Sequence, residues 1–145
     1  MAIVGRPNVG KSSIFNRFLK KRKAIVDSTH GITRDRLCAN IEVDGFTVKL
    51  IDTGGIKAKS KERMIRLVYK QTRAAIEEAD IILFVCDVAT GATAEDFEIN
   101  ELLRKSGKKV FLLVNKVDNI KLRDGILDFY QLGAGEPYPI STIHN

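Results

Sequence analysis

Long apolar runs are missing from this 145-residue sequence, and none approaches the roughly 20 residues that a membrane-spanning helix needs. The start, MAIVGRPN, has no charged stretch followed by a long apolar one, so we expect no secretory signal peptide. Internal repeats and low-complexity linkers are also missing. With 44% hydrophobic and 29% charged residues, the composition is typical of one globular domain with its own core. We therefore expect a cytoplasmic protein with no membrane partner.

The sequence has only two cysteines, and its 18 acidic residues are fewer than its 24 lysines and arginines. Cys38 and Cys86 lie in apolar, strand-like runs, where a disulfide or a two-cysteine metal site is the alternative to the buried, reduced thiols that we expect. The net charge is +6, and basic residues cluster at 20–23, 57–66 and 104–109. Such blocks are usually solvated surface, although a basic excess also favours a polyanionic partner such as RNA.

Short apolar segments alternate with amphipathic ones along the chain. The apolar segments predict six strands, at residues 2–5, 37–43, 46–51, 81–86, 110–114 and 137–141. The amphipathic segments predict helices at 11–21, at 60–79, between residues 93 and 107, and at 122–132, where Gly125 weakens the pattern. Thr93 and Asp96 have the spacing of a capping box, and Gly107 is suited to end that helix.

This alternation predicts an α/β fold with a mainly parallel six-stranded sheet and flanking helices. The Asp44-Gly45 pair between two strand-like runs predicts a hairpin, which adds one antiparallel strand. Residues 24–36 show no regular pattern, and we expect them to be irregular. The sequence stops directly after the last strand, where a helix would normally cover one face. We therefore expect residues 1–145 to be one domain of a longer protein, with the terminal helix missing.

The segment GRPNVGKSS, residues 5–13, matches the phosphate-binding pattern G-x-x-x-x-G-K-[ST] between a strand and a helix. Its glycines allow backbone N–H groups to turn toward phosphate oxygens, and the helix N-terminus adds a positive dipole end. Lys11 can neutralise the β- and γ-phosphates, and the Ser12 hydroxyl can ligate Mg²⁺. Pro7 stiffens the loop, and Arg6 is expected to face solvent at its edge. The predicted nucleotide-binding residues here are Gly5, Arg6, Pro7, Asn8, Val9, Gly10, Lys11, Ser12 and Ser13.

The segment NKVD, residues 115–118, follows an apolar strand at the carboxyl end, where ligands bind in open α/β sheets. Asp118 can accept hydrogen bonds from guanine N1–H and N2–H₂, a pair that adenine does not offer. Asn115 can tie loops together, and the Lys116 stem can lie along the base. A polar turn after a strand is the alternative for an isolated tetrapeptide. Combined with the phosphate loop, the motif predicts guanine recognition by Asn115, Lys116, Val117 and Asp118.

The segment LIDTGGI, residues 50–56, supplies a D-x-x-G motif at the end of a strand. Asp52 can hold a Mg²⁺-bound water, and the Gly55 N–H can sense the γ-phosphate. Thr33, in the segment HGITRD, is the predicted second Mg²⁺ ligand, so that loss of the γ-phosphate would release both segments. The predicted metal set is Ser12, Thr33 and Asp52, and the nucleotide-binding residues of this motif are Asp52, Thr53, Gly54, Gly55 and Ile56.

Together the motifs resemble those of the translation-factor-related GTPases, which have a Ras-like P-loop fold. The resemblance is closest to the EngA/Der family of bacterial ribosome-assembly GTPases. AIVGRPNVGKSS, GITRDR, LIDTGGI, EADIILFVCD, LLVNKVD and FYQLGAGEPYPIS look like its first GTPase domain, over essentially the whole chain. GITRDR and LGAGEPYPIS favour this family over Era and the tRNA-modifying GTPase MnmE, which have a similar P-loop.

The resemblance implies a GTPase domain at 1–145, followed in the full-length protein by a second GTPase domain and a KH-like domain. It implies GTP, GDP and Mg²⁺ as ligands, and binding to the large ribosomal subunit with GTP occupancy controlling the domain arrangement. Family members end the guanine site with Ser-Ala, whose backbone N–H contacts guanine O6. Here Ser141 is followed by Thr142, a change that a backbone contact tolerates.

Hydrolysis depends on positioning and charge stabilisation. Ras-type enzymes orient water with a glutamine directly after D-x-x-G, where this chain has Ile56. Similar GTPases with an asparagine at the position of Asn8 use K⁺ beside the phosphates. We therefore expect Asn8 to ligate K⁺ in place of an arginine finger. Arg34 is the rival finger, although a salt bridge to Asp35 or exposure to solvent is the favoured alternative for this residue. The predicted catalytic residues are Asn8, Lys11, Thr33 and Gly55.

The motifs leave alternatives to a slow GTP hydrolase that acts as a switch in ribosome assembly. One is a GTP-dependent binding module with negligible hydrolysis, since Ile56 cannot orient water through its side chain. Another is an Era- or MnmE-like GTPase that acts on rRNA or in tRNA modification. A kinase or ATPase is disfavoured by NKVD.

Overall fold

A computed structural model of the chain describes residues 1–21, 24–28, 37–54 and 59–143. In this part the elements follow one another as β1 (Ala2–Val4), α1 (Lys11–Lys21), β2 (Ala24–Ser28), β3 (Leu37–Val43), β4 (Phe46–Asp52), α2 (Lys61–Glu78), β5 (Ile81–Asp87), α3 (Ala94–Ser106), β6 (Lys109–Asn115), the 3₁₀ helix η1 (Ile120–Leu132) and β7 (Pro137–Pro139).

The strands form one sheet in the order β2-β3-β4-β1-β5-β6-β7. β1 pairs in parallel with both β4 and β5, and β5–β6 and β6–β7 are also parallel. β3 pairs antiparallel with β2 and with β4, so it is the reversed strand of the described sheet. The predicted α/β architecture, a mainly parallel sheet with one antiparallel strand, is confirmed.

β2 extends the sheet beyond the six predicted strands. Residues 24–28 were expected to be irregular, but they pair with β3 over the register Ala24↔Ile41 to Ser28↔Leu37. The outer edge of β3 offers backbone N–H and C=O groups, and an added strand satisfies them. Residues 29–36, the rest of the segment expected to be irregular, lie outside the described residues.

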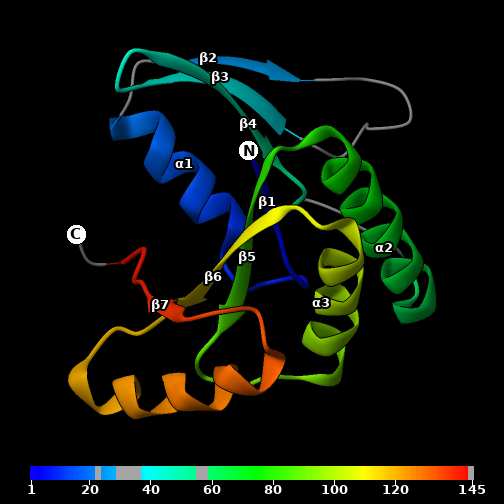
Figure 1. Cartoon of the computed structure of the whole chain (residues 1–145), viewed down its shortest axis with the longest axis vertical. Helices are drawn as coiled ribbons and strands as arrows, with labels where there is room; N and C mark the ends of the chain where they lie inside the picture. Colours follow the sequence, from blue (N-terminus) through cyan, green and yellow to red (C-terminus); the bar gives the residue numbers. More distant parts are fainter. Residues whose placement is uncertain (22–23, 29–36, 55–58, 144–145) are drawn as a thin grey trace.

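Helices cover the two faces of the sheet, with α1 on one side and α2 and α3 on the other (Figure 1). The central strands β1 and β5 are buried on both faces, so their successive residues alternate between two apolar clusters. In β5, Ile82, Phe84 and Cys86 join the cluster under α2, α3 and η1, while Leu83 and Val85 join the cluster under α1. This double cover explains why β5 has a continuous apolar sequence.

Local signals in the sequence account for several ends of elements. The Thr93 side chain accepts from the Asp96 N–H and the Asp96 carboxylate accepts from the Thr93 N–H, which confirms the capping box. Gly107 ends α3 in the left-handed conformation, with φ 67°. Asp44 and Gly45 have φ 49° and 84°, which confirms the tight hairpin turn between β3 and β4.

The predicted helix at 122–132 is a 3₁₀ helix that begins two residues earlier. Gly125 lies where a Cβ atom would be 2.9 Å from Val88 Cγ2. A glycine here therefore allows η1 to approach the chain directly after β5.

Both cysteines are buried free thiols, as the sequence predicts. Burial, followed by the nearby Asp96 carboxylate, raises the pKa of the Cys86 thiol well above its ordinary range. Among the described residues, no helix is long and apolar enough to span a bilayer.

Candidate nucleotide-binding site

The three loops that carry the motifs leave the same edge of the sheet, at the carboxyl ends of the parallel strands β1, β4 and β6. The phosphate loop follows β1, the D-x-x-G motif follows β4, and NKVD begins at the last residue of β6. Binding sites in open α/β sheets form at this edge. The fold therefore gathers motifs that are separated by some hundred residues in the sequence.

Two glycines of the phosphate loop occupy positions without room for a side chain. A Cβ atom on Gly5 would lie 2.5 Å from the Val85 carbonyl oxygen, and one on Gly10 would lie 2.2 Å from Asn115 Nδ2. Gly10 also has φ 101°, in the region that favours glycine. Both glycines are thus required for the loop to pack against its neighbours.

Asn8, between these glycines, has φ 67° and an exposed side chain. Asparagine is one of the few residues other than glycine that adopt this left-handed conformation readily. The asparagine in the middle of the loop therefore has a backbone role whether or not its side chain binds a cation.

Lys11 begins α1 and its side chain turns back into the phosphate loop. Its Nζ donates to the carbonyl oxygens of Gly5 at 2.8 Å and Arg6 at 2.7 Å, and the residue is only 6% exposed. Burial lowers the pKa of Lys11 to about 8, with the Asp52 carboxylate acting in the opposite direction and the Arg6 charge lowering it further. A buried cation held at a helix N-terminus is well suited to attract phosphate.

Ser12 and Asp52 place a hydroxyl and a carboxylate side by side. Ser12 Oγ donates to Asp52 Oδ2 at 3.1 Å, and the Gly54 N–H donates to Asp52 Oδ1 at 2.9 Å. Hard oxygen donors of this kind suit Mg²⁺. The described residues contain no group of three His, Cys, Asp or Glu side chains arranged to hold a metal ion, so Mg²⁺ would need ligands from a phosphate as well.

A cavity of about 540 Å³ lies over the phosphate loop. Its walls come from the loop, the start of α1, the D-x-x-G motif, α2 and the loop after β6, namely Gly5, Pro7, Asn8, Gly10, Lys11, Ser12, Ser13, Thr53, Gly54, Val68 and Lys116. Thr53 is fixed by a hydrogen bond of 2.8 Å from its hydroxyl to the Ile3 carbonyl oxygen. The cavity is large enough for a small-molecule ligand.

The NKVD loop is bonded directly to the phosphate loop. Asn115 Nδ2 donates to the Val9 carbonyl oxygen at 2.9 Å, and Lys116 Nζ donates to the Asn8 carbonyl oxygen at 2.9 Å. Lys116 Nζ also pairs with Asp87 Oδ2 at 2.9 Å, and Lys116 has φ 67°. The two loops therefore form one connected unit.

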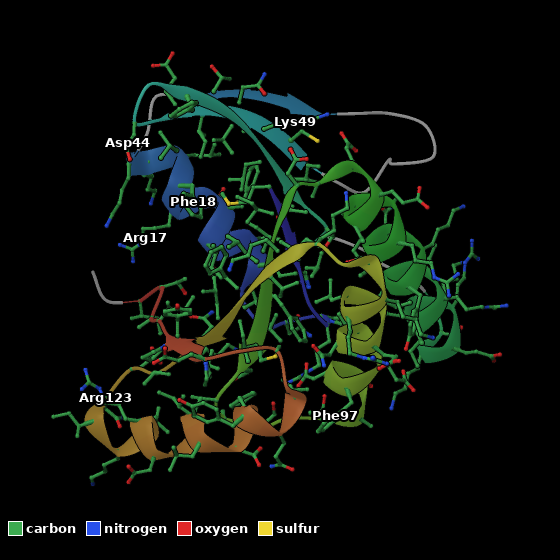
Figure 2. The ribbon with its side chains drawn as sticks, in the orientation of Figure 1. Arg17, Phe18, Asp44, Lys49, Phe97 and Arg123 are labelled. Carbon is green, nitrogen blue, oxygen red and sulfur yellow. The ribbon has the colours of Figure 1, made fainter. Side chains whose placement is uncertain are left out.

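Asp118 lies half-buried at the far end of the same loop and accepts a hydrogen bond of 2.6 Å from Ser141 Oγ. The loop is also joined to the residue directly after β7, because the Val117 N–H donates to the Ile140 carbonyl oxygen at 3.1 Å. Arg17 on α1 points toward the C-terminal segment, where its guanidinium donates to the Thr142 carbonyl oxygen at 2.6 Å (Figure 2). The structure thus brings Ser141 to the predicted base-reading carboxylate.

Some predicted residues cannot be located in this arrangement. Thr33, Gly55 and Ile56, together with the rival finger Arg34, lie outside the described residues. The expected roles of these residues stay predictions.

The prediction for Arg6 is wrong. Its side chain is only 15% exposed and does not face solvent: Nε lies 3.4 Å from Asp96 Oδ1, and Nη2 donates to Thr90 Oγ1. Asp96 itself is completely buried. The partner is 90 residues away in the sequence, and no local pattern connects the two residues.

Sequence reasoning also missed Asp87, which pairs with Lys116. The signal was present, because Asp87 is a carboxylate at the carboxyl end of a buried parallel strand. It ends the segment EADIILFVCD, which served only to identify the family resemblance.

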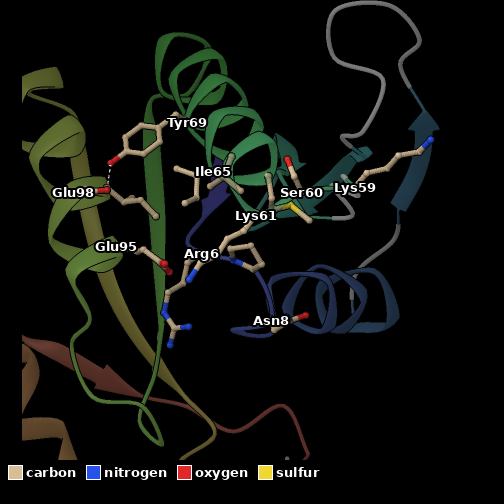
Figure 3. A pocket seen from close by; sticks show the side chains of 13 residues that line it. Arg6, Asn8, Lys59, Ser60, Lys61, Ile65, Tyr69, Glu95 and Glu98 are labelled. Carbon is tan, nitrogen blue, oxygen red and sulfur yellow. Dashed lines mark hydrogen bonds between the residues drawn. The ribbon is translucent and has the colours of Figure 1, made fainter.

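A second cavity, of about 390 Å³, lies beside the phosphate loop between α2 and α3 (Figure 3). Apolar side chains of α2, including Ile65 and Val68, line it opposite Glu95 and Glu98 of α3. Tyr69 donates a hydrogen bond to Glu98 across the two helices, and burial followed by this bond raises the pKa of Tyr69 to about 12. This cavity contains neither Lys11 nor a glycine of the phosphate loop.

A glycine loop that opens a helix with a buried lysine, on a mainly parallel α/β sheet, defines the class of P-loop nucleotide-binding domains. The comparison with known families is consistent with this class: the family described as 50S ribosome-binding GTPase matches residues 1–116. This match covers most of the chain, and the chain belongs to that family.

Curated relatives narrow the assignment. GTPase Der of Limosilactobacillus fermentum and GTPase Der of Geobacillus thermodenitrificans are each 50% identical to the chain over 144 residues. Each alignment covers 99% of this chain and 33% of the relative, so the chain spans about one third of the length of these proteins. The resemblance to the first GTPase domain of the EngA/Der family is confirmed.

Solved structures support the same fold. Era of Aquifex aeolicus bound to GDP·AlF₄⁻ is 30% identical with a TM-score of 0.68, over 98% of this chain and 50% of that chain. Era in complex with MgGDPNP and nucleotides of 16S ribosomal RNA is 31% identical with a TM-score of 0.68, over the same shares. These neighbours are Ras-like P-loop GTPases, as the sequence predicts.

Proposed function

We propose that this chain binds GTP and GDP in the cavity over the phosphate loop and hydrolyses GTP slowly as a molecular switch. One observation carries the proposal: side chains of the NKVD loop donate to carbonyl oxygens of the phosphate loop, Asn115 to Val9 and Lys116 to Asn8. A guanine-reading loop and a phosphate-binding loop joined in this way suit a ligand that spans both.

Asp118 is the residue that would select guanine. Its carboxylate would accept hydrogen bonds from guanine N1–H and N2–H₂, and the Ser141 hydroxyl, which donates to Asp118 Oδ1 at 2.6 Å, would help to orient it. Adenine lacks this pair of donors, so binding it would leave the carboxylate poorly paired. The backbone N–H at Thr142 would contact guanine O6, and the Lys116 stem would lie along the base.

Lys11 and the loop backbone would bind the phosphates. Lys11 Nζ already rests on two carbonyl oxygens, and an arriving β-phosphate would give this buried cation the negative partner it lacks in the loop itself. Binding would therefore raise the pKa of Lys11 from its lowered value of about 8.

Ser12 and Asp52 fit a Mg²⁺ site because they place a hydroxyl and a buried carboxylate next to the start of α1. Ser12 would ligate the ion directly, Asp52 would hold a water bound to it, and Thr33 would complete the set. The ion, when bound, supplies positive charge near the phosphates. The chain's own residues orient it and hold the phosphates in place.

Hydrolysis needs a further source of charge, because Ile56 replaces the water-orienting glutamine of Ras-type enzymes. The Asn8 amide oxygen is proposed to ligate K⁺ there, in competition with a role for Arg34. Turnover in KCl is then expected to exceed turnover in NaCl. Because Asn8 has φ 67°, Asn8→Ala would also strain the loop, and Asn8→Gly is the control that removes the amide without that strain. Equal rates of the wild type in both salts would exclude the cation role.

We also propose that the full-length protein acts on the ribosome. The family is described by binding to the 50S ribosome, and an Era structure contains ribosomal RNA. A net charge of +6 suits an RNA-rich partner. In the full-length, cytoplasmic protein, a second GTPase domain and a KH-like domain would act together with this one.

The test is nucleotide displacement followed by single-turnover hydrolysis. GTP and GDP are expected to displace a fluorescent guanine nucleotide at concentrations at which ATP does not. Hydrolysis without ribosomal subunits separates a GTPase from a binding module with negligible turnover, and acceleration by 50S but not 30S subunits supports the ribosomal role. Displacement by ATP at the GTP concentration would overturn the proposal.

A further inference from the structure

The Asp96 carboxylate of α3 lies outside the cavity over the phosphate loop, yet it reaches the phosphate loop through Arg6. Building on the proposed function, we propose that Asp96 is a positioning residue for Lys11. In this scheme Asp96 holds the Arg6 side chain, and the Arg6 backbone in turn holds the lysine that binds the β-phosphate.

Asp96 uses its two oxygens for different purposes. Oδ2 accepts from the Thr93 N–H at 2.9 Å and caps α3, while Oδ1 lies 3.4 Å from Arg6 Nε. That separation is an ion-pair distance rather than a hydrogen bond. Because Asp96 is fully buried, solvent screens this pair weakly. The cap uses Oδ2 and the contact with Arg6 Nε uses Oδ1, while the buried Cys86 thiol is a further hydrogen-bonding neighbour of this carboxylate.

Arg6 transmits the contact to Lys11. Its carbonyl oxygen accepts the hydrogen bond of 2.7 Å from Lys11 Nζ, while its guanidinium reaches Asp96 and Thr90. Thr90 is itself fixed, because its hydroxyl donates to the Asp87 carbonyl oxygen at 3.1 Å. Arg6 is therefore held at two points: its backbone carbonyl by Lys11 and its side chain by Asp96 in the first turn of α3.

Figure 3 shows the Arg6 side chain extending from the phosphate loop toward the α3 side of the cavity between α2 and α3. The Arg6 side chain is only 15% exposed, and a partly buried guanidinium is stabilised by an anion beside it. If Asp96 lost its charge, Arg6 would be drawn toward water, and the Arg6 carbonyl that supports Lys11 would move with it. The phosphate end of the site would lose its geometry while the base end kept its own.

Asp96→Asn is the direct test, because an asparagine oxygen still accepts from the Thr93 N–H and preserves the cap. The dissociation constant for GDP is expected to rise about tenfold, as for coupled neighbours in a network. Glu95→Gln is the matched control: it removes an exposed carboxylate from the same helical turn, and among the described residues Glu95 forms no hydrogen bond or ion pair with Arg6. Its GDP dissociation constant is expected to stay within about twofold of the wild-type value.

Arg6→Gln tests the same link from the other side and serves if Asp96→Asn fails to fold. It is expected to weaken GDP binding to a similar extent. The double variant Arg6→Gln, Asp96→Asn leaves no unpaired buried charge, so it should bind GDP no more weakly than either single variant. Strictly additive losses in this cycle would overturn the inference.

A ligand without a β-phosphate separates positioning from general structural damage. Asp96→Asn should weaken GDP binding but leave GMP binding unchanged, because GMP does not reach Lys11. Equal losses for GDP and GMP, or no loss for GDP, would exclude a positioning role while leaving guanine binding by the wild type intact. A wild-type chain that binds neither nucleotide would overturn the proposed function and this inference together.

Discussion

The phosphate end and the guanine end of the proposed site differ in how much of their bonding is complete without a ligand. Lys11 is 6% exposed and rests on two loop carbonyl oxygens, and the loop is joined to Asn115 and Lys116. Asp118, in contrast, is half-buried and accepts a hydrogen bond from the Ser141 hydroxyl. A preformed phosphate end loses little entropy on binding, which favours affinity. The more open guanine end must form its contacts with the base, which favours selectivity.

Removing the cation from the preformed end should have the largest effect. Lys11→Met keeps a long apolar side chain in the buried position but removes the charge and both carbonyl contacts. GDP affinity is expected to fall by about 1,000-fold, as for several lost charge-assisted hydrogen bonds. Calorimetric titration measures it, with the exposed Lys20→Met of the same helix as control. A loss of less than tenfold would mean that the phosphate end is not the main source of affinity.

Removing the carboxylate from the guanine end should have the next largest effect on GDP affinity, and it should also reduce the selectivity for guanine over adenine. Asp118→Ala is expected to lower GDP affinity by about 100-fold while ADP affinity hardly changes, since only guanine offers two donors to the carboxylate. Competition between the two nucleotides for a fluorescent analogue measures the change in selectivity. Asp124→Ala, a loss of the same charge on the exposed side of η1, is the control. An unchanged GDP-to-ADP ratio would remove Asp118 from base recognition.

The pH dependence of binding should reveal the buried lysine. Because burial lowers the pKa of unliganded Lys11 to about 8, raising the pH from 7 to 9 removes the charge that phosphate needs. GDP affinity should fall by about tenfold over this range. Lys11→Arg stays charged and should show a flat profile. A wild-type profile as flat as that of Lys11→Arg would contradict the lowered pKa.

The same lowered pKa predicts how folding stability changes with pH. Between about 8 and the ordinary value of 10.5, the unfolded chain keeps a proton on Lys11 that the folded chain has lost. The contribution of this group to stability therefore rises with pH through that window. Thermal melts of the unliganded wild type and of Lys11→Met should diverge there.

Weakening the bond between the two ends should have the smallest effect. Asp87→Asn keeps an acceptor for the Ala89 N–H, which now donates to Asp87 Oδ1 at 2.9 Å, but removes the anion beside Lys116. GDP affinity is expected to fall by about fivefold, as for one charge-assisted contact at a partly exposed lysine. Fluorescence titration detects this change. A loss as large as that of Asp118→Ala would mean that the two ends are far more tightly coupled than their contacts suggest.

Contiguous signals made most of the fold predictable from the sequence. The Asp44-Gly45 turn, the Thr93–Asp96 capping box and Gly107 act within a few residues, and each is found as expected. β2 was not predicted, because an edge strand depends on the backbone of its neighbour rather than on a pattern of its own. The motifs likewise gave the position of the site at one edge of the sheet.

The misassigned parts of the site depend on contacts between distant residues. A basic residue inside a glycine-rich loop is exposed on average, and only the position of α3 relative to β1 buries Arg6 against Asp96. Similarly, nothing near Gly10 indicates that Asn115 occupies the space of its missing side chain. Motifs identify which residues bind, but the packing between elements decides what holds those residues.

The contacts of Asn115 and Lys116 with the phosphate loop also bear on the synthesis of the protein. Residues 115 and 116 lie 106 and 108 positions after the carbonyl groups that they bind. At translation rates of about 5–20 residues per second, the phosphate loop waits roughly 5–20 seconds for these partners. A nascent chain that ends before residue 115 contains the whole glycine-rich motif but lacks the Asn115 and Lys116 side chains that bond to it. The phosphate loop therefore lacks these two hydrogen bonds during synthesis and gains them only when the chain extends past residue 116.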